Sequence, residues 1–343
     1  MVNMPNPVLI ELTRGTRVES RHRGAFAMAR ADGTRLVALG DIDAPVYPRS
    51  AVKMLQAIAF VESGAVERFE MGLPEVAIAC ASHSGTPRHV QVVEELLARA
   101  GLTPAALGCG AHEPLDAEAA RALARAGRTP LALHNNCSGK HAAMLATAAH
   151  RGEPIEGYWR VEHPVQQRVR EVLQDLTGAP LAASACGIDG CSVPSWAIGL
   201  ADLARAFARF ATQERLAPAR AQACRRIAAA CFAHPDLVAG ERRLDTRMMR
   251  ELRGQVLLKS GAEGVYCGAL LTRGVGFAIK IDDGAKRAAE AVAARLVASQ
   301  TPAAMAPTPD PTLKNVRGLR VGTTRASQEL QELLQTLDAR SAP

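Results

Sequence analysis

Aromatic residues are scarce in this chain, which contains two Trp, three Tyr and seven Phe, or 3% of its residues. Proteins that bind single-stranded nucleic acid stack bases on aromatic side chains, and nucleic-acid binders in general carry a basic patch. Here the net charge of +7 comes from positive residues that are spread along the whole chain without a dense basic block. We therefore interpret the charge as solvated surface and predict no nucleic-acid partner.

Long apolar runs are missing as well. A helix that crosses a bilayer needs about 20 consecutive apolar residues, and no stretch of the sequence approaches that length. The chain does not begin with a basic segment followed by an apolar one, which is the pattern of a secretory signal peptide. The eight Cys are scattered rather than grouped in a short framework, so we expect thiols or metal ligands in a reducing compartment. These absences predict a cytoplasmic enzyme without a membrane partner.

Strand patterns occur at both ends of the sequence. A strand is predicted at 7–13, and a hairpin is predicted from the two halves of 24–41. Three further strand patterns occur within 255–284. The apolar run within 74–85 indicates a buried strand that enters a polar loop. A Pro-rich link at 301–312 follows the last predicted helix.

Helical periodicity fills the middle of the chain. The first helix is predicted after Ser50, which we place at its N-cap because Val52, Leu55, Ile58 and Ala59 follow a 3.6-residue period. Further helices are predicted near 86–100, 116–126, 138–150, 162–177, 195–212, 217–233, 245–252 and 285–299. This order predicts a single catalytic unit with one α/β lobe, from about 1–48 and 255–343, and a mostly helical lobe from about 49–254.

Lysine is the rare basic residue of this chain, because only six of its 41 basic residues are Lys. A desolvated Lys can lose its proton and act as a base or a ligand, whereas Arg keeps its charge. A Lys beside a nucleophile is therefore informative here. The six are Lys53, Lys140, Lys259, Lys280, Lys286 and Lys314.

Ser50 and Lys53 form an S-x-x-K motif at the start of a predicted helix. Residues three apart share one helix face, so the Lys53 amine could take the Ser50 proton and activate a nucleophile. The positive end of the helix dipole would lower the pKa of Lys53 and stabilise an oxyanion. A surface lysine behind an N-cap serine is the more common meaning of this motif when it stands alone.

Lys259, Ser260 and Gly261 end an apolar strand. A strand with Lys-Ser/Thr-Gly beside an S-x-x-K helix is the arrangement of penicillin-recognising serine hydrolases. The order of elements is also theirs: hairpin, S-x-x-K helix, helical insert, K-S-G strand, C-terminal helix. Ser82, between the apolar run and His83, stands where a third polar motif could enter the same cleft, although its spacing alone favours a turn of small polar residues.

Cys137, Lys140 and His141 lie together in HNNCSGKHAAML (134–145). Cys137 directly precedes a predicted helix, whose dipole lowers the pKa of a thiol at that end. Lys140, three residues later, lies on the same face of the helix as Cys137. Downstream, the Gly-rich segment 185–195 supplies Cys186, Asp189 and Cys191. Two thiolates and a nitrogen donor with one open position would suit zinc. The alternatives are buried thiols, a helix cap, or a Cys nucleophile paired with His134 or His141.

Taken together, these motifs resemble the Rhizobium-type, thermolabile L-asparaginases. The resemblance extends over nearly the whole chain, and HNNCSGKHAAML and CGIDGCSVP are its most specific segments. It implies an α/β fold like that of serine β-lactamases and penicillin-binding proteins, an antiparallel sheet flanked by helices with an inserted helical lobe. It also implies a homodimer that hydrolyses L-asparagine to L-aspartate and ammonia, in the manner of the related β-lactamase-like glutaminases.

The resemblance assigns roles to individual residues. Ser50 and Lys53 correspond to a first Ser–Lys pair with Ser50 as nucleophile, and Ser82 and Lys259 to a second pair. A zinc ion is implied, with water at the open position. Its ligands would be Cys137, Lys140 and Cys191. Partners that orient ligands or bind substrate would be Arg49, His141 and Asp189. Because Ser82-His83-Ser84 lacks the Asn of the β-lactamase middle motif, we do not expect β-lactam chemistry.

Several functions remain compatible with these residues. A glutaminase of the same fold would use the same groups, and zinc-bound hydroxide could attack directly without Ser50. A protein of another class, an amino-acid sensor stabilised by zinc, would bind asparagine without turnover. A sensor has no need of neutral lysines, so two Ser–Lys pairs favour the enzyme.

Overall fold

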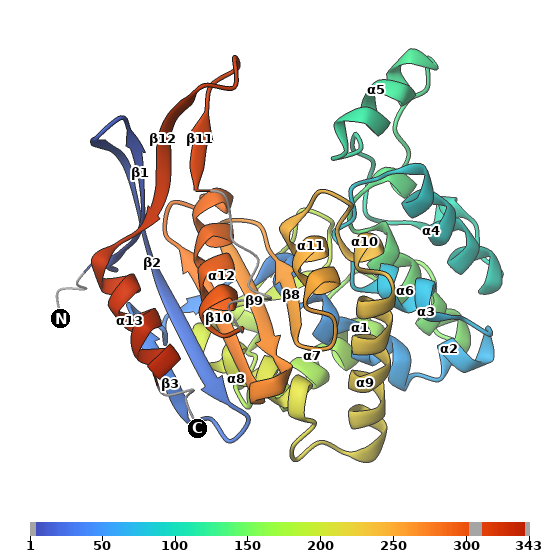
Figure 1. The fold of residues 1–343 in the computed structure, drawn as a ribbon. Helices are drawn as coiled ribbons and strands as arrows, with labels where there is room; N and C mark the ends of the chain where they lie inside the picture. Colours follow the sequence, from blue (N-terminus) through green and yellow to red (C-terminus); the bar gives the residue numbers. More distant parts are fainter. Residues whose placement is uncertain (1–4, 302–310, 340–343) are drawn as a thin grey trace.

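The computed structural model describes residues 5–301 and 311–339, and it centres on an eight-stranded sheet (Figure 1). The strand path is β11-β12-β1-β2-β10-β9-β8, β3 pairs with β2 beside this path, and every pairing is antiparallel. The strands are β1 (Val8–Arg14), β2 (Arg17–Arg30), β3 (Arg35–Leu39), β8 (Val256–Ser260), β9 (Val265–Leu270), β10 (Val275–Ile281), β11 (Thr312–Lys314) and β12 (Arg320–Ala326). The strands expected at 7–13, in 24–41 and in 255–284 are confirmed, whereas β11 and β12 were not predicted.

Helices cover both faces of this sheet. Successive side chains of a strand point to opposite faces, so in β2 Phe26 and Met28 pack with α12 (Lys286–Ser299) while Ala25 and Ala27 pack with α8 (Leu200–Thr212). The small side chains let α8 lie close, and at Gly276 an added Cβ would be only 2.0 Å from the Ala204 carbonyl oxygen. The C-terminal α13 (Gln328–Ala339) packs beside α12. The predicted antiparallel sheet flanked by helices is confirmed.

The remaining helices gather at one side of the sheet (Figure 1). They are α1 (Lys53–Glu62), α2 (Ala65–Arg68), α3 (Leu73–Ala79), α4 (Pro87–Arg99), α5 (Ala117–Arg125), α6 (Ser138–Arg151), α7 (Pro164–Thr177), α9 (Pro218–Ala233), α10 (Pro235–Val238) and α11 (Leu244–Glu251). Two small two-stranded antiparallel sheets accompany them. One joins β4 (Pro45–Val46) to β7 (Ile198–Gly199), and the other joins β5 (Cys186–Ile188) to β6 (Pro194–Trp196). Among the residues of both described ranges, no helix combines the length and the apolar character needed to span a membrane.

The buried strand expected within 74–85 is wrong. Residues 73–79 form α3, and the loop 80–85 follows it. The start of this helix is marked by Gly72, whose N–H donates to the Glu75 carboxylate at 3.0 Å, and by Pro74 in the first turn. A short apolar run that is buried on all sides has no periodicity by which to tell a helix from a strand.

Three other expectations need correction. Ser50 is not the N-cap of α1 but lies inside the preceding 3-10 turn η1 (Arg49–Val52), whose N-cap is Pro48. The helix expected over 195–212 begins only at Leu200, because β6 and β7 occupy the residues before it. The Pro-rich link at 301–312 lies largely outside the described residues.

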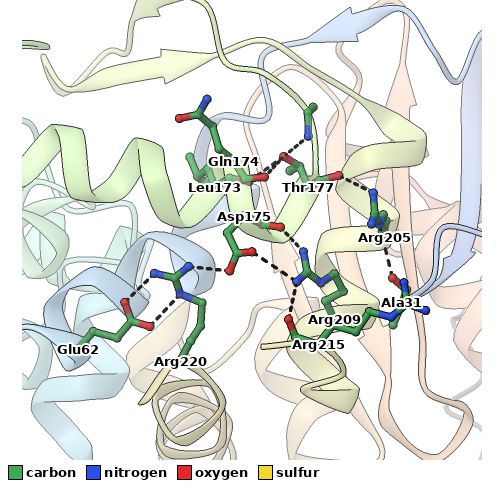
Figure 2. A network of polar contacts seen from close by, with 11 residues as sticks. Ala31, Glu62, Leu173, Gln174, Asp175, Thr177, Arg205, Arg209, Arg215 and Arg220 are labelled. Atoms are coloured by element: carbon green, nitrogen blue, oxygen red, sulfur yellow. Dashed lines mark hydrogen bonds and ion pairs between the residues drawn. The ribbon is translucent and has the colours of Figure 1, made fainter. Parts of the chain in front are cut away.

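A network of arginines and carboxylates ties helical segments to the sheet (Figure 2). Arg220 of α9 donates to both Glu62 oxygens, at 2.8 and 2.9 Å, and to Asp175 at 2.6 Å. Arg209 of α8 donates to the Asp175 carbonyl and side chain, and Arg205 donates to the Thr177 carbonyl at 3.5 Å. These cations lie at the C-terminal end of α7, where the helix dipole favours positive charge.

We expect Arg220→Met to lower the free energy of unfolding by about 1–3 kcal/mol, because it leaves the partly buried Glu62 carboxylate without a charged partner and Asp175 with only its 3.4 Å contact to Arg209. Arg250→Met is a matched control. Arg250 also donates two hydrogen bonds to one carboxylate, that of Glu241, but both side chains are about half exposed or more. Its expected cost is below about 1 kcal/mol. Urea unfolding measures both, and equal losses in the two variants would contradict the prediction.

Candidate active site

Ser50 opens onto a pocket of about 230 Å³ at the junction of the sheet and the helices. The hydroxyl belongs to a half-buried residue, so it is within reach of a small molecule. The walls come from five separate chain segments and include half of the ten site residues predicted from the sequence. They are Arg49, His112, Asn135, Asn136, Cys137, Asp189, Gly190, Cys191 and Ala262.

The turn that carries Ser50 lies against the end of β8. Gly261, which follows the Lys259-Ser260 pair, is so close that an added Cβ would be 2.8 Å from the Pro48 carbonyl oxygen and 3.2 Å from the Ala51 nitrogen. Only a glycine lets these two main-chain segments approach in this way. The K-S-G strand therefore borders the S-x-x-K turn, and Ala262 beyond it lines the pocket.

Lys53 is fully buried, and its amine reaches away from Ser50. Its Nζ donates to the Ala81 carbonyl at 2.6 Å, to Ser82 Oγ at 3.0 Å and to Cys137 Sγ at 3.0 Å. These three contacts use all three donors of an ammonium group. The structure thus pairs Lys53 with Ser82, whereas the sequence predicted that it pairs with Ser50.

Lys259 is also fully buried, and its Nζ donates to the Ser260 carbonyl oxygen at 2.9 Å. Burial lowers the pKa of Lys259 to about 7, and the nearby positive charge of Lys53 acts in the same direction. The amine is therefore poised to be neutral near physiological pH. Ser82, the predicted partner of Lys259, accepts a hydrogen bond from Lys53 instead.

The two thiols of the pocket differ in charge. Cys137 is the N-cap residue of α6, and its hydrogen bond to Cys191 together with burial raises the pKa of Cys137 to about 12. The same hydrogen bond lowers the pKa of Cys191 to about 5, against the effect of burial, and the charge of Lys140 adds to this. The expected low pKa of Cys137 is wrong, because its thiol is buried and acts as the donor. The negative charge of this pair is therefore favoured on Cys191.

Lys140 completes a compact cluster with these thiols. Its Nζ lies 3.2 Å from Cys191 Sγ, and the side chain is buried. Burial works to lower the pKa of Lys140, but the sulfurs of Cys191 and Cys137 and the Asp189 carboxylate hold it above its ordinary value. Between Cys137 and Lys140, Gly139 packs on α3, where an added Cβ would be 2.2 Å from the Ile78 carbonyl oxygen.

Arg49 and Asp189 face each other across the mouth of the pocket. Arg49 Nε donates to Asp189 Oδ1 at 2.6 Å, and the two side chains are 27% and 10% exposed. Burial favours the protonated acid, but Lys140 and Arg49 hold the pKa of Asp189 below its usual value. The structure thus places a cation and an anion beside Ser50, which matches the charges of an amino-acid zwitterion.

His141 lies behind the thiols rather than in the pocket wall. His141 Nδ1 is hydrogen-bonded to the Tyr158 hydroxyl at 2.5 Å, and that hydroxyl also accepts from the Gly108 N–H. Burial lowers the pKa of His141 to about 3, with the charge of Lys140 acting in the same direction. Its Nε2 is buried and has no hydrogen-bond partner among the described residues.

Three pocket residues were missed by sequence reasoning. The Asn135 side chain accepts from the Cys137 N–H at 2.9 Å and donates to the Cys109 and Gly110 carbonyls, so it holds the thiol-bearing turn in place. His112 accepts from the Asn136 N–H at 2.9 Å. The two Asn immediately before Cys137 were the available signal, whereas nothing in the sequence near His112 connects it with this turn.

Most of the chain matches one known protein family. The family model for L-asparaginase II matches residues 10–326. The chain belongs to the L-asparaginase II family. The predicted asparaginase relationship is thereby confirmed at the level of the family, and a search among curated proteins found no significant match.

Solved structures resemble this L-asparaginase II family member only distantly. Mglu in its native form is 16% identical with a TM-score of 0.42, and the match covers 80% of this chain and 63% of that one. D-alanine carboxypeptidase AmpC from Burkholderia cenocepacia is 12% identical with a TM-score of 0.38, covering 78% of this chain and 90% of that one. The chain thus spans less than two thirds of the length of Mglu, and TM-scores this low do not establish a common fold.

The donor set of this family member fits a zinc ion. Zinc takes thiolates and nitrogen donors in a tetrahedral site, and Cys191 accepts hydrogen bonds from Lys140 and from the Cys137 thiol. Within residues 5–301 and 311–339, no three His, Cys, Asp or Glu side chains are grouped as a metal site, so a zinc ion here would depend on Lys140 as its third ligand. The alternative Cys–His nucleophile is not supported, since His134 accepts from the Leu131 N–H and His141 bonds to Tyr158.

Proposed function

We propose that this protein is an L-asparaginase that hydrolyses L-asparagine to L-aspartate and ammonia through an acyl-enzyme on Ser50. The observation that carries the proposal is the surroundings of Ser50. Its hydroxyl lines a pocket sized for a small molecule, and three of the six lysines of the chain are buried around that pocket. Family membership supports amide hydrolysis as the reaction.

Substrate recognition would rest on Arg49 and Asp189. Their ion pair presents a guanidinium and a carboxylate at the pocket wall, so the substrate α-carboxylate would bind Arg49 and its α-amino group would bind Asp189. A guanidinium binds carboxylates with two parallel hydrogen bonds. This orientation points the side-chain amide of asparagine toward Ser50, and the 230 Å³ pocket suits a four-carbon amino acid.

In the proposed reaction, Ser50 Oγ attacks the side-chain amide carbon and loses its proton to a neutral lysine. Backbone N–H groups beside Ser50 would stabilise the oxyanion. The C–N bond then breaks, the protonated nitrogen leaves as ammonia, and water hydrolyses the Ser50 ester to aspartate. Lys53 is the base proposed for Ser50, and it would have to exchange one of its three present contacts for the Ser50 hydroxyl.

Ser82 and Lys259 would complete the reaction. Lys53 contacts Ser82, so we propose that Ser82 relays the proton that Lys53 takes from Ser50 to the departing nitrogen, which completes acylation. Burial lowers the pKa of Lys259 to about 7, so this amine can be neutral and would activate the water that deacylates Ser50.

The nucleophile is tested by Ser50→Ala. We expect ammonia release from asparagine to fall at least about 1,000-fold, because no acyl-enzyme can form. Ser299→Ala, a remote serine on α12, should leave the rate unchanged. Asparagine and glutamine are compared in the same assay. Survival of activity in Ser50→Ala would sink the serine mechanism, and asparagine binding without turnover by the wild-type protein would favour the sensor.

The role of Lys259 predicts a pH profile. Because only the neutral amine acts as a base in deacylation, kcat should rise with pH through an apparent pKa near 7, the value to which burial lowers the pKa of Lys259. Lys259→Met should lower kcat and remove this rise. Lys314→Met serves as the control, because Lys314 is the exposed residue of β11. A profile of the same shape in wild type and Lys259→Met would rule out Lys259 as the titrating group.

Zinc is part of the proposal. Cys137, Lys140 and Cys191 would hold the ion, with water in the remaining position, and the bound ion would supply positive charge next to the substrate α-carboxylate or α-amino group. Elemental analysis should find about one zinc per chain in wild type and much less in Lys140→Met, with Lys314→Met as the control. Chelation should weaken asparaginase activity without abolishing it. Full zinc content in Lys140→Met would contradict this ligand set.

The resemblance to Rhizobium-type asparaginases also implies a homodimer and a cytoplasmic location, and we keep both as proposals. Neither is needed for the pocket described above, since Ser50, both thiols and the buried lysines come from one chain.

A further inference from the structure

A second pocket, of about 380 Å³, lies between α11 and α12 and is strongly basic. Glu290 is the one acidic residue among those that line it. Its cationic lining residues are Arg242, Arg243, Arg247, Lys286, Arg287 and Arg295. The sequence suggested solvated charge without a patch, because these residues come from stretches about forty positions apart.

The fold brings these stretches together over the sheet. In Figure 1, α11 and α12 lie on either side of β8, and α11 packs on β8 while α12 packs on β9 and β10. Pro311 and Thr324, beside β11 and in β12, form another wall. The Ser260 hydroxyl of β8 accepts a hydrogen bond from Arg243, so this side chain lies on the face of the sheet that borders the basic pocket. Lys259 points to the opposite face, as neighbours in a strand do, so the basic pocket is separate from the one at Ser50.

Two of the six cations form ion pairs, and for the other four the described part of the chain provides no carboxylate within ion-pair distance. Arg242 pairs with Asp116 at 2.7 Å and Lys286 with Glu290 at 3.5 Å. The contacts of the others are to neutral groups: Arg243 donates to Ser260 Oγ, Arg287 to His22 Nε2, and Arg295 to the carbonyls of Ala291 and Thr324.

Two helices also start at this pocket. Neither α11 nor α12 has a side chain that caps its first N–H groups, and Lys286 and Arg287 occupy the first turn of α12. The N-terminal end of a helix carries partial positive charge, so cations there are unfavourable. The Arg243 Nε is buried and has no partner among the described residues. Repulsion of this kind is relieved when an anion binds.

We infer that this pocket binds a small polyanion with two or more linked phosphate groups. Four cations without an ion-pair partner among the described residues exceed what a single monovalent anion needs. Arginine dominates the set, and its planar guanidinium matches phosphate oxygens with paired hydrogen bonds. The lining includes no aromatic side chain, so a nucleobase would find no stacking surface and the phosphate chain itself is what the site recognises.

Calorimetric titration of the full chain with inorganic tripolyphosphate tests the inference, at an ionic strength near 0.15 M to screen diffuse attraction. The test variant is Arg247→Gln/Lys286→Gln, because both side chains are exposed and Arg247 has no polar side-chain contact among the described residues. Arg121→Gln/Arg125→Gln removes the same charge from the exposed face of α5 and serves as the matched control. Circular dichroism checks that both variants are folded.

We expect saturable binding of tripolyphosphate that weakens at least about 10-fold in the test variant, because two cations that would hydrogen-bond to phosphate oxygens are removed. The control should bind as wild type does. ATP should bind much as tripolyphosphate does and adenosine should not bind, which would separate phosphate recognition from base recognition.

Three outcomes would overturn the inference. Absence of saturable binding by wild type would remove the site, and equal weakening in both variants would mean that only the net charge matters. Much tighter binding of duplex DNA, lost in the same test variant, would make the pocket part of a nucleic-acid surface. None of these measurements depends on Ser50 or on asparagine hydrolysis, so the two proposals fail separately.

Discussion

The burial of three amines around one pocket is the constraint on which the site depends. A charged amine loses several kcal/mol of hydration when it is buried, unless a partner replaces the water. Each of the three buried lysines meets this requirement in a different way. Lys53 has three acceptors, Lys140 lies beside the Cys191 thiolate, and Lys259 has its pKa lowered toward 7. The last of these is the amine that is ready to act as a base.

Meeting that constraint requires close approach of main-chain segments, and two glycines permit it. Gly139 lets α6 lie on the end of α3, which brings Cys137 and Lys140 to the loop that carries Ser82. Gly261 lets the K-S-G strand border the turn at Ser50. The network around Arg220 then ties α9 to the ends of α1 and α7 (Figure 2). The reactive groups are thus positioned by packing of the whole chain rather than by any one motif.

Local patterns predicted the elements well where periodicity was clear. The strands at both chain ends and the helices α4, α5, α7, α9 and α12 lie where their residues indicated. The error at 74–85 came from an apolar run buried on every side, in which strand and helix look alike. The error about Cys137 had another cause. Its position before a helix predicted a thiolate, but the pKa of each thiol depends on which one donates to the other.

By itself, the sequence determined the inventory of the site. Rare lysines in S-x-x-K and K-S-G motifs, and Cys137 with Cys191, identified reactive residues because those signals depend on residue type and local spacing. Only the tertiary structure decided which groups are partners. Lys53 bonds to Ser82 and Cys137, 29 and 84 positions away, rather than to Ser50 three positions away. In the same way, arginines scattered through the sequence became one basic pocket. Contacts between distant segments are set by packing, which local spacing does not record.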